Sequence, residues 1–126
     1  MTWARRAWLW GPVLAAMTAI FIASSRSDLR PPEGVTDKQA HSAGYAGLGA
    51  LVARALAGGF GAPLSLWRVA GAVAITTAYG GSDEWHQSFV PGREADFHDV
   101  WADAVGAVAG TAGCWAWGII RSRSDV

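Results

Sequence analysis

The chain has 126 residues, enough for one domain, of which 52% are hydrophobic and 16% are charged. Ten basic and ten acidic residues give a formal net charge of zero, which excludes the strongly basic balance typical of nucleic-acid binding. The single cysteine, Cys114, excludes an internal disulfide and fits a packing role. We therefore expect one domain over residues 1–126 and no nucleic-acid partner.

The first predicted element is the run AWLWGPVLAAMTAIFIASS, which carries no charge between Arg6 and Arg26. A transmembrane helix needs about 20 apolar residues. The run is longer than the apolar core of a signal peptide, which is about 7–15 residues. We therefore predict a retained transmembrane helix here.

Three further helices are predicted at about residues 37–56, 66–83 and 99–120. Each is apolar over most of its length and carries its polar residues mainly at its ends. Arg54 lies close enough to the end of its helix to snorkel towards water. A Gly/Pro turn at 58–65 separates the second helix from the third. The expected fold class is all-α, a polytopic membrane protein with four transmembrane helices in a compact bundle.

The basic residues indicate the orientation of this bundle. Four spans place both termini on one side, and six basic residues fall on that side against four on the other. The six are Arg5, Arg6, Arg54, Arg68, Arg121 and Arg123, and the four are Arg26, Arg30, Lys38 and Arg93. The positive-inside rule therefore favours an N-in and C-in topology.

Charge is concentrated in the stretch SDEWHQSFVPGREADFHD, which is predicted to join the third and fourth helices on the outer side. Residues three, four or seven apart share one face of a helix. One such face holds Asp37, His41 and Tyr45, another holds Tyr79, Asp83 and Gln87, and a third holds Asp96, Asp99 and Asp103. Ionisable side chains at membrane depth are costly unless they face one another or water. We therefore expect a polar cleft that opens to the outer surface.

Carboxylates outnumber the fixed positive charges of this cleft, Lys38 and Arg93. Three explanations stay open: shared protons with raised pKa values, a bound divalent metal ion, or a cationic substrate. His41, His86 and His98 could add nitrogen ligands to a metal.

Two local patterns have both a functional and a structural interpretation. The neighbours Asp83 and Glu84 fit an acid/base pair or a metal site, or else ion pairing and helix capping. The turn before Arg93 fixes a side chain suited to binding phosphate or carboxylate, or else to clasping a neighbouring acid. The fourth helix also carries glycines that favour close helix packing, Gly106, Gly110 and Gly113.

Three stretches, DKQAHSAGYAGLGAL, AYGGSDEWHQSFVPGR and DVWADAVGAVAGTAG, together resemble the VanZ-like family of small bacterial membrane proteins over about residues 37–113. The resemblance implies a multi-pass protein of the bacterial cytoplasmic membrane. The family is named after a member linked to teicoplanin resistance, and no reaction is settled for it. Many relatives have Asn where this chain has Asp103, which puts a fixed role for that position in doubt.

From the residues and the resemblance we expect a cell-envelope protein whose cleft binds, and could modify or move, an anionic lipid or lipid-linked cell-wall intermediate. The acid/base residues, which are also the candidate metal ligands, are Asp83, Glu84, His41 and Asp99. The substrate-binding residues are Arg93, Lys38, Asp37, Gln87, Tyr45, Tyr79 and Asp103. The alternatives are a non-catalytic binding or proton-coupled transport protein, and a purely structural polar cluster.

Overall fold

The computed structural model describes residues 1–124 and contains four helices. They are α1 (Trp3–Ser24), α2 (Asp37–Ala57), α3 (Leu66–Gln87) and α4 (Asp99–Ser124). No β-strand occurs within the described residues, so the prediction of an all-α chain with four helices is confirmed. Helix α3 continues past its predicted end at residue 83 and therefore includes Gln87.

Side-chain caps set the starts of three helices. Thr2, Thr36 and Ser65 each accept a hydrogen bond from the backbone N–H three residues further on. At Thr36 the Gln39 side chain accepts in return from the Thr36 N–H, which completes a capping box. Gly58 ends α2 with a φ of 92°, a conformation that favours glycine.

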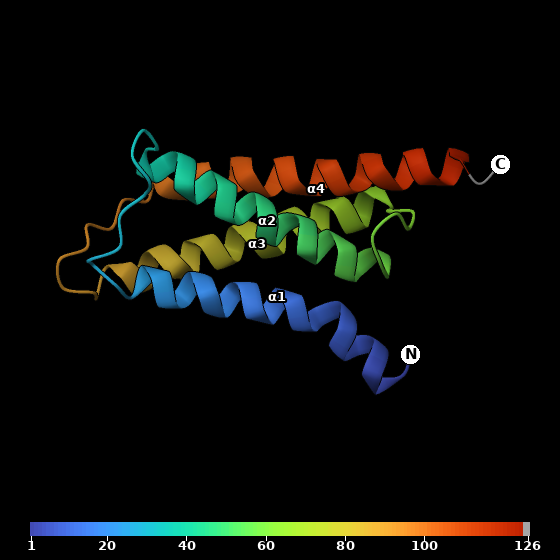
Figure 1. The fold of residues 1–126 in the computed structure, drawn as a ribbon, viewed down its shortest axis with the longest axis horizontal. Helices are drawn as coiled ribbons and strands as arrows, with labels where there is room; N and C mark the ends of the chain where they lie inside the picture. Colours follow the sequence, from blue (N-terminus) through green and yellow to red (C-terminus); the bar gives the residue numbers. More distant parts are fainter. Residues whose placement is uncertain (125–126) are drawn as a thin grey trace.

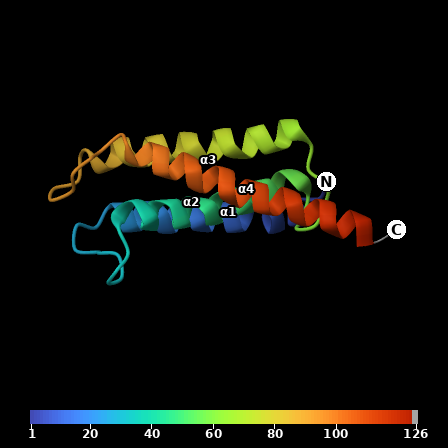
Figure 2. The same ribbon diagram turned by 90° about the horizontal axis from the view of Figure 1, so that it is seen from above.

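The helices run antiparallel, with both termini and the 58–65 turn at one end and the two longer loops at the other (Figure 1). Helix α2 packs most extensively against α4, and α4 runs obliquely across the bundle (Figure 2). We call the end with the 25–36 and 88–98 loops the loop end, and the opposite end the terminal end.

Glycines allow the close approach of α4 to α2. A Cβ at Gly106 would overlap the backbone of Ser42, and one at Gly110 would overlap the backbone of Ala46. The packing prediction is confirmed for these two glycines. It is wrong for Gly113, where a Cβ would meet nothing within 4 Å. At Gly113 no other helix within the described residues packs closely against α4.

The outside of the bundle is rich in apolar side chains. Exposed examples lie on three different helices and include Trp8, Leu14, Ile75, Val105 and Val108. Within the described residues, α1 is the one helix that is both long and apolar enough to cross a membrane. A signal sequence or a buried core helix has the same two properties, so this finding alone is weak support for a membrane span.

Arg54 does not snorkel as the sequence suggested, because it is only 5% exposed. Its guanidinium lies 4.0 Å from the ring centre of Trp8, and its Nη1 donates to the carbonyls of Trp8 and Leu9, each at 3.2 Å. Pro12 lies inside α1 and has no N–H, so the Trp8 carbonyl lacks its usual helical donor. Arg54 supplies that donor, which explains its burial. Figure 1 shows α1 bending in this part.

Candidate functional site

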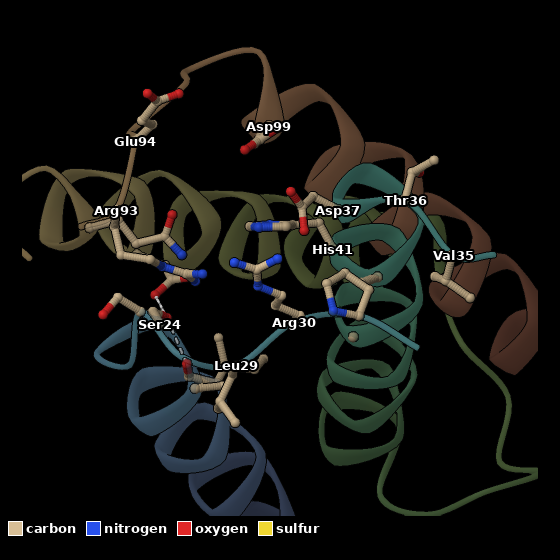
Figure 3. Close-up of a pocket in the computed structure, with 18 of the residues that line it drawn as sticks. Ser24, Leu29, Arg30, Val35, Thr36, Asp37, His41, Arg93, Glu94 and Asp99 are labelled. Atoms are coloured by element: carbon tan, nitrogen blue, oxygen red, sulfur yellow. Dashed lines mark hydrogen bonds between the residues drawn. The ribbon is translucent and has the colours of Figure 1, made fainter. Parts of the chain in front are cut away.

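A cleft of about 1050 Å³ opens at the loop end of the bundle. Its walls come from the end of α1, the start of α2, the end of α3 and both loops, as Figure 3 shows. Seven of the predicted site residues line it: Asp37, His41, Tyr45, Asp83, Gln87, Arg93 and Asp99. Four do not appear among its lining residues: Lys38, Tyr79, Glu84 and Asp103. The structure thus places the predicted residues in an open cleft and in a layer around it.

Asp83 joins three helices at the wall of the cleft. It is buried, and its Oδ1 accepts a hydrogen bond from the Ser24 hydroxyl of α1. Its Oδ2 accepts from the Tyr45 hydroxyl of α2 at 3.0 Å. Both carboxylate oxygens therefore have partners within the chain. Because neither partner is basic, the alternative of ion pairing that the sequence left open is not what the structure shows for Asp83.

Asp103 lies behind His41. Its Oδ1 is 2.9 Å from Nδ1 of His41, and its side chain is fully buried. Gly80 of α3 makes room for it, since a Cβ at that position would come 2.7 Å from Asp103 Oδ2. His41 itself is partly exposed and lines the cleft. The histidine is therefore held from behind by a carboxylate while one side of it reaches the cleft.

Glu84 is fully buried and holds the loop between α3 and α4. Its Oε1 accepts a hydrogen bond from the backbone N–H of Asp96. In that loop the Asp96 carboxylate accepts from the backbone N–H of His98 and contacts its ring Nδ1 at 2.9 Å. These hydrogen bonds lower the pKa of the Asp96 carboxyl. The geometry gives Glu84 a positioning role in the fold of the loop.

A tight turn presents Arg93 to the cleft. The Arg93 N–H donates to the Val90 carbonyl at 3.2 Å, Pro91 occupies the second position and Gly92 has a φ of 79°. Proline followed by a positive-φ glycine is the signature of a type II turn. The expectation that the Pro-Gly pair makes a tight turn before Arg93 is confirmed.

The remaining predicted residues are placed at the edges of the site. Lys38 lies 3.9 Å from Asp99, but the lysine is well exposed, so this pair contributes little to stability. The Tyr79 hydroxyl donates to the Met17 carbonyl, which ties α3 to α1. His86 stacks on Phe21 of α1, a second contact between these helices.

Four carboxylates in and around the cleft each contact a different partner. Asp83 has two hydroxyls, Asp103 has an imidazole, Glu84 has a backbone N–H, and Asp99 has an ammonium group. Among the described residues, no three His, Cys, Asp or Glu side chains are placed to hold a metal ion together. The placement of the four metal candidates therefore gives no support to a metal site.

Among the lining residues of the cleft that were not predicted as site residues, Ser24 and Arg30 matter most to the site. Ser24 ends the apolar run of α1, and its position at the last turn of a span was the only available signal. Arg30 precedes two prolines in the loop between α1 and α2 and lines the cleft. Its basic charge was visible in the sequence, but the path of the loop was not.

The comparisons with known proteins give one result. A family model described as VanZ/LLP1 matches residues 9–120, which is most of the chain. No curated protein matches the chain. No solved structure matches it either.

Proposed function

The chain belongs to the VanZ/LLP1 family, and from this premise we propose that it is a multi-pass protein of the bacterial cell envelope. Its cleft faces outward and binds an anionic lipid or a lipid-linked cell-wall intermediate. If the ligand is a cell-wall intermediate, this function would be compatible with a link to resistance against teicoplanin-type glycopeptides.

Helix length and exposed apolar surface support four membrane spans. The helices have 22, 21, 22 and 26 residues, and at about 1.5 Å per residue each can cross a hydrocarbon core of about 30 Å. Large apolar side chains face outward on α1, α3 and α4. Polar residues lower the mean hydropathy of α2, α3 and α4, and several of them are buried inside the bundle. Glu84 and Asp103 are examples. The positive-inside rule then places the loop end outside.

The observation that carries the function is the make-up of the cleft. Its lining combines the polar side chains of Asp83, Gln87 and Arg93 with the apolar side chains of Ile20 and Leu29. A cleft with both polar and apolar lining suits a ligand that has a charged head group and an apolar chain. We therefore favour a membrane lipid over a fully soluble ligand.

Should the bound lipid be modified, His41 is the best-placed general base. It lines the cleft and its Nδ1 contacts Asp103, so Nε2 stays free for a substrate proton. Asp99 lines the cleft as well, whereas Asp83 already accepts two hydrogen bonds. We assign Glu84 to positioning, because its Oε1 accepts the Asp96 N–H from the loop that carries Arg93.

A structural function for part of the network is favoured by a specific observation. The hydrogen bonds of Asp83 join α1, α2 and α3, and the contact between His41 and Asp103 joins α2 to α4. Asp83, Tyr45 and His41 therefore both join the helices and line the cleft.

Filling the cleft tests the binding function. Gly44 of α2 lines the cleft, and a Cβ there would meet nothing within 4 Å, so Gly44→Phe can fill the space without disturbing the packing. Gly47 lies on the same helix, is equally open and does not line the cleft, which makes Gly47→Phe the matched control. Native mass spectrometry of the purified chain would compare a polyprenyl phosphate and phosphatidylglycerol with phosphatidylcholine.

The expected result is that the wild type and Gly47→Phe prefer the two anionic lipids. Gly44→Phe should weaken their binding by about tenfold or more, which corresponds to at least ~1.4 kcal/mol. Equal binding of all three lipids by the wild type, or equal binding by both variants, would contradict the proposed function.

A further inference from the structure

Two arginines from different loops point into the same cleft. Arg30 comes from the loop between α1 and α2, and Arg93 comes from the loop between α3 and α4. Figure 3 shows both guanidinium groups directed towards the interior of the cleft. The chain brings them together although 63 positions separate them in the sequence.

Neither arginine has a direct acidic partner among the described residues. Within residues 1–124 neither Arg30 nor Arg93 forms an ion pair, and the buried Nε of Arg93 has no hydrogen-bond partner. Arg26, in the same loop as Arg30, behaves differently. Its Nε and Nη2 donate to the two carboxylate oxygens of Asp28 at 3.1 and 2.8 Å. A buried donor without a partner is costly, so a ligand acceptor beside Arg93 would be favourable.

Four acids line the cleft, namely Asp37, Asp83, Glu94 and Asp99, and among the described residues none forms an ion pair with Arg30 or Arg93. Both oxygens of Asp83 accept hydrogen bonds from hydroxyl groups, and Asp99 lies 3.9 Å from Lys38. The backbone on each side of the cleft is also restricted. Pro31 and Pro32 follow Arg30, and the turn at Gly92 precedes Arg93. The backbone is therefore restricted where each arginine enters the cleft, and neither guanidinium group forms an ion pair there.

We propose that Arg30 and Arg93 form a clamp that binds one phosphate-type oxyanion in the cleft. Guanidinium groups suit this ligand because their planar N–H donors can each bind two oxygen atoms of a phosphate. The inference rests on the proposed function and deepens it, since it names the head group and adds Arg30, which lies outside the motif region 37–113. The oxyanion belongs either to a lipid head group or to a free phosphate.

The test measures equilibrium binding of a polyprenyl phosphate and of phosphatidylglycerol to the full chain in a neutral detergent. The variants are Arg30→Gln, Arg93→Gln and the double variant, with Arg26→Gln as the control because Arg26 is paired with Asp28 and does not line the cleft. Circular dichroism verifies that each variant keeps its helices. Competition with inorganic phosphate identifies the source of the oxyanion.

The clamp predicts that Arg30→Gln and Arg93→Gln each weaken lipid binding about tenfold, as expected for the loss of a charge-assisted pair. The double variant should lose less than the product of the two effects, because both residues hold one group. Arg26→Gln should bind as the wild type does. Displacement of the lipid by inorganic phosphate would support the clamp with free phosphate as a ligand. If inorganic phosphate does not displace the lipid and Arg30→Gln still weakens lipid binding, the result would support a clamp that binds the lipid head group.

Two results separate the failure of the clamp from the failure of the proposed function. If Arg30→Gln binds as the wild type does while Gly44→Phe loses binding, the clamp is wrong and the lipid cleft stands. If the wild type binds the two anionic lipids no better than phosphatidylcholine, and Gly44→Phe changes none of these affinities, both the clamp and the proposed function are wrong.

Discussion

The two ends of the bundle bury charge in opposite ways. At the terminal end, Arg54 is enclosed between the rings of Trp8 and Phe60 and donates to two backbone carbonyls of α1. At the loop end, Glu84 Oε2, Asp103 Oδ2 and Arg93 Nε are buried without a partner. The loop end also contains the cleft.

This difference separates a structural charge, Arg54, from Arg93, which lines the cleft and has a buried Nε without a partner. Arg54 has hydrogen-bond partners inside the chain. Its burial is explained because it donates to the Trp8 carbonyl, which Pro12 leaves without a helical donor. Buried polar atoms without partners cost free energy, and they persist where a function compensates for that cost. The comparison therefore gives Arg54 a stabilising role at the terminal end and supports our proposal that the loop end binds a ligand.

The largest effect on stability is expected at Arg54. Arg54→Ala removes the donor to the Trp8 and Leu9 carbonyls and leaves a cavity beside Trp8. We expect the free energy of unfolding to fall by about 2–4 kcal/mol. Lipid binding by the chain that remains folded should not change. Unfolding in a denaturing detergent measures the loss, with the exposed Arg68→Ala as the control for charge removal at the same end. If Arg54→Ala and Arg68→Ala lowered the free energy of unfolding equally, the structural role of Arg54 at the terminal end would be wrong.

A smaller effect is expected at Glu84, which belongs to the loop end. Glu84→Ala removes the acceptor for the Asp96 N–H, whereas Glu84→Gln retains an oxygen at that place. The alanine variant should lose about 1 kcal/mol of stability, and its Asp96 amide should exchange hydrogen faster. Lipid binding should weaken several-fold because the loop that carries Arg93 is less fixed. If the Asp96 amide is as protected in Glu84→Ala as in Glu84→Gln, the positioning role is wrong.

The helices could be predicted because their signals are local. Caps at Thr2, Thr36 and Ser65 and the glycine turn at 58–65 set the element boundaries within a few residues. The periodic placement of Asp83 and Gln87 was also sufficient to put them on one face.

The partners of the site residues could not be predicted, because they depend on contacts between distant segments. The burial of Arg54 follows from Pro12, which lies on another helix. The Ser24 hydrogen bond to Asp83 and the entry of Arg30 into the cleft depend on how α1 packs and where its loop runs. Helical spacing within one segment carries no information on the Ser24–Asp83 hydrogen bond or on the path of the loop that holds Arg30.

The most direct test of the assignment of binding to the loop end is a map of where an anionic lipid contacts the chain. A photoreactive polyprenyl phosphate would be crosslinked to the full chain, and the modified peptides would be compared with those from a photoreactive phosphatidylcholine. We predict crosslinks specific to the anionic lipid at residues 20–24 and 40–45, which contribute walls of the cleft, and their loss in Gly44→Phe. Specific crosslinks around Trp8 and Phe60, or the same pattern for both lipids, would contradict the account.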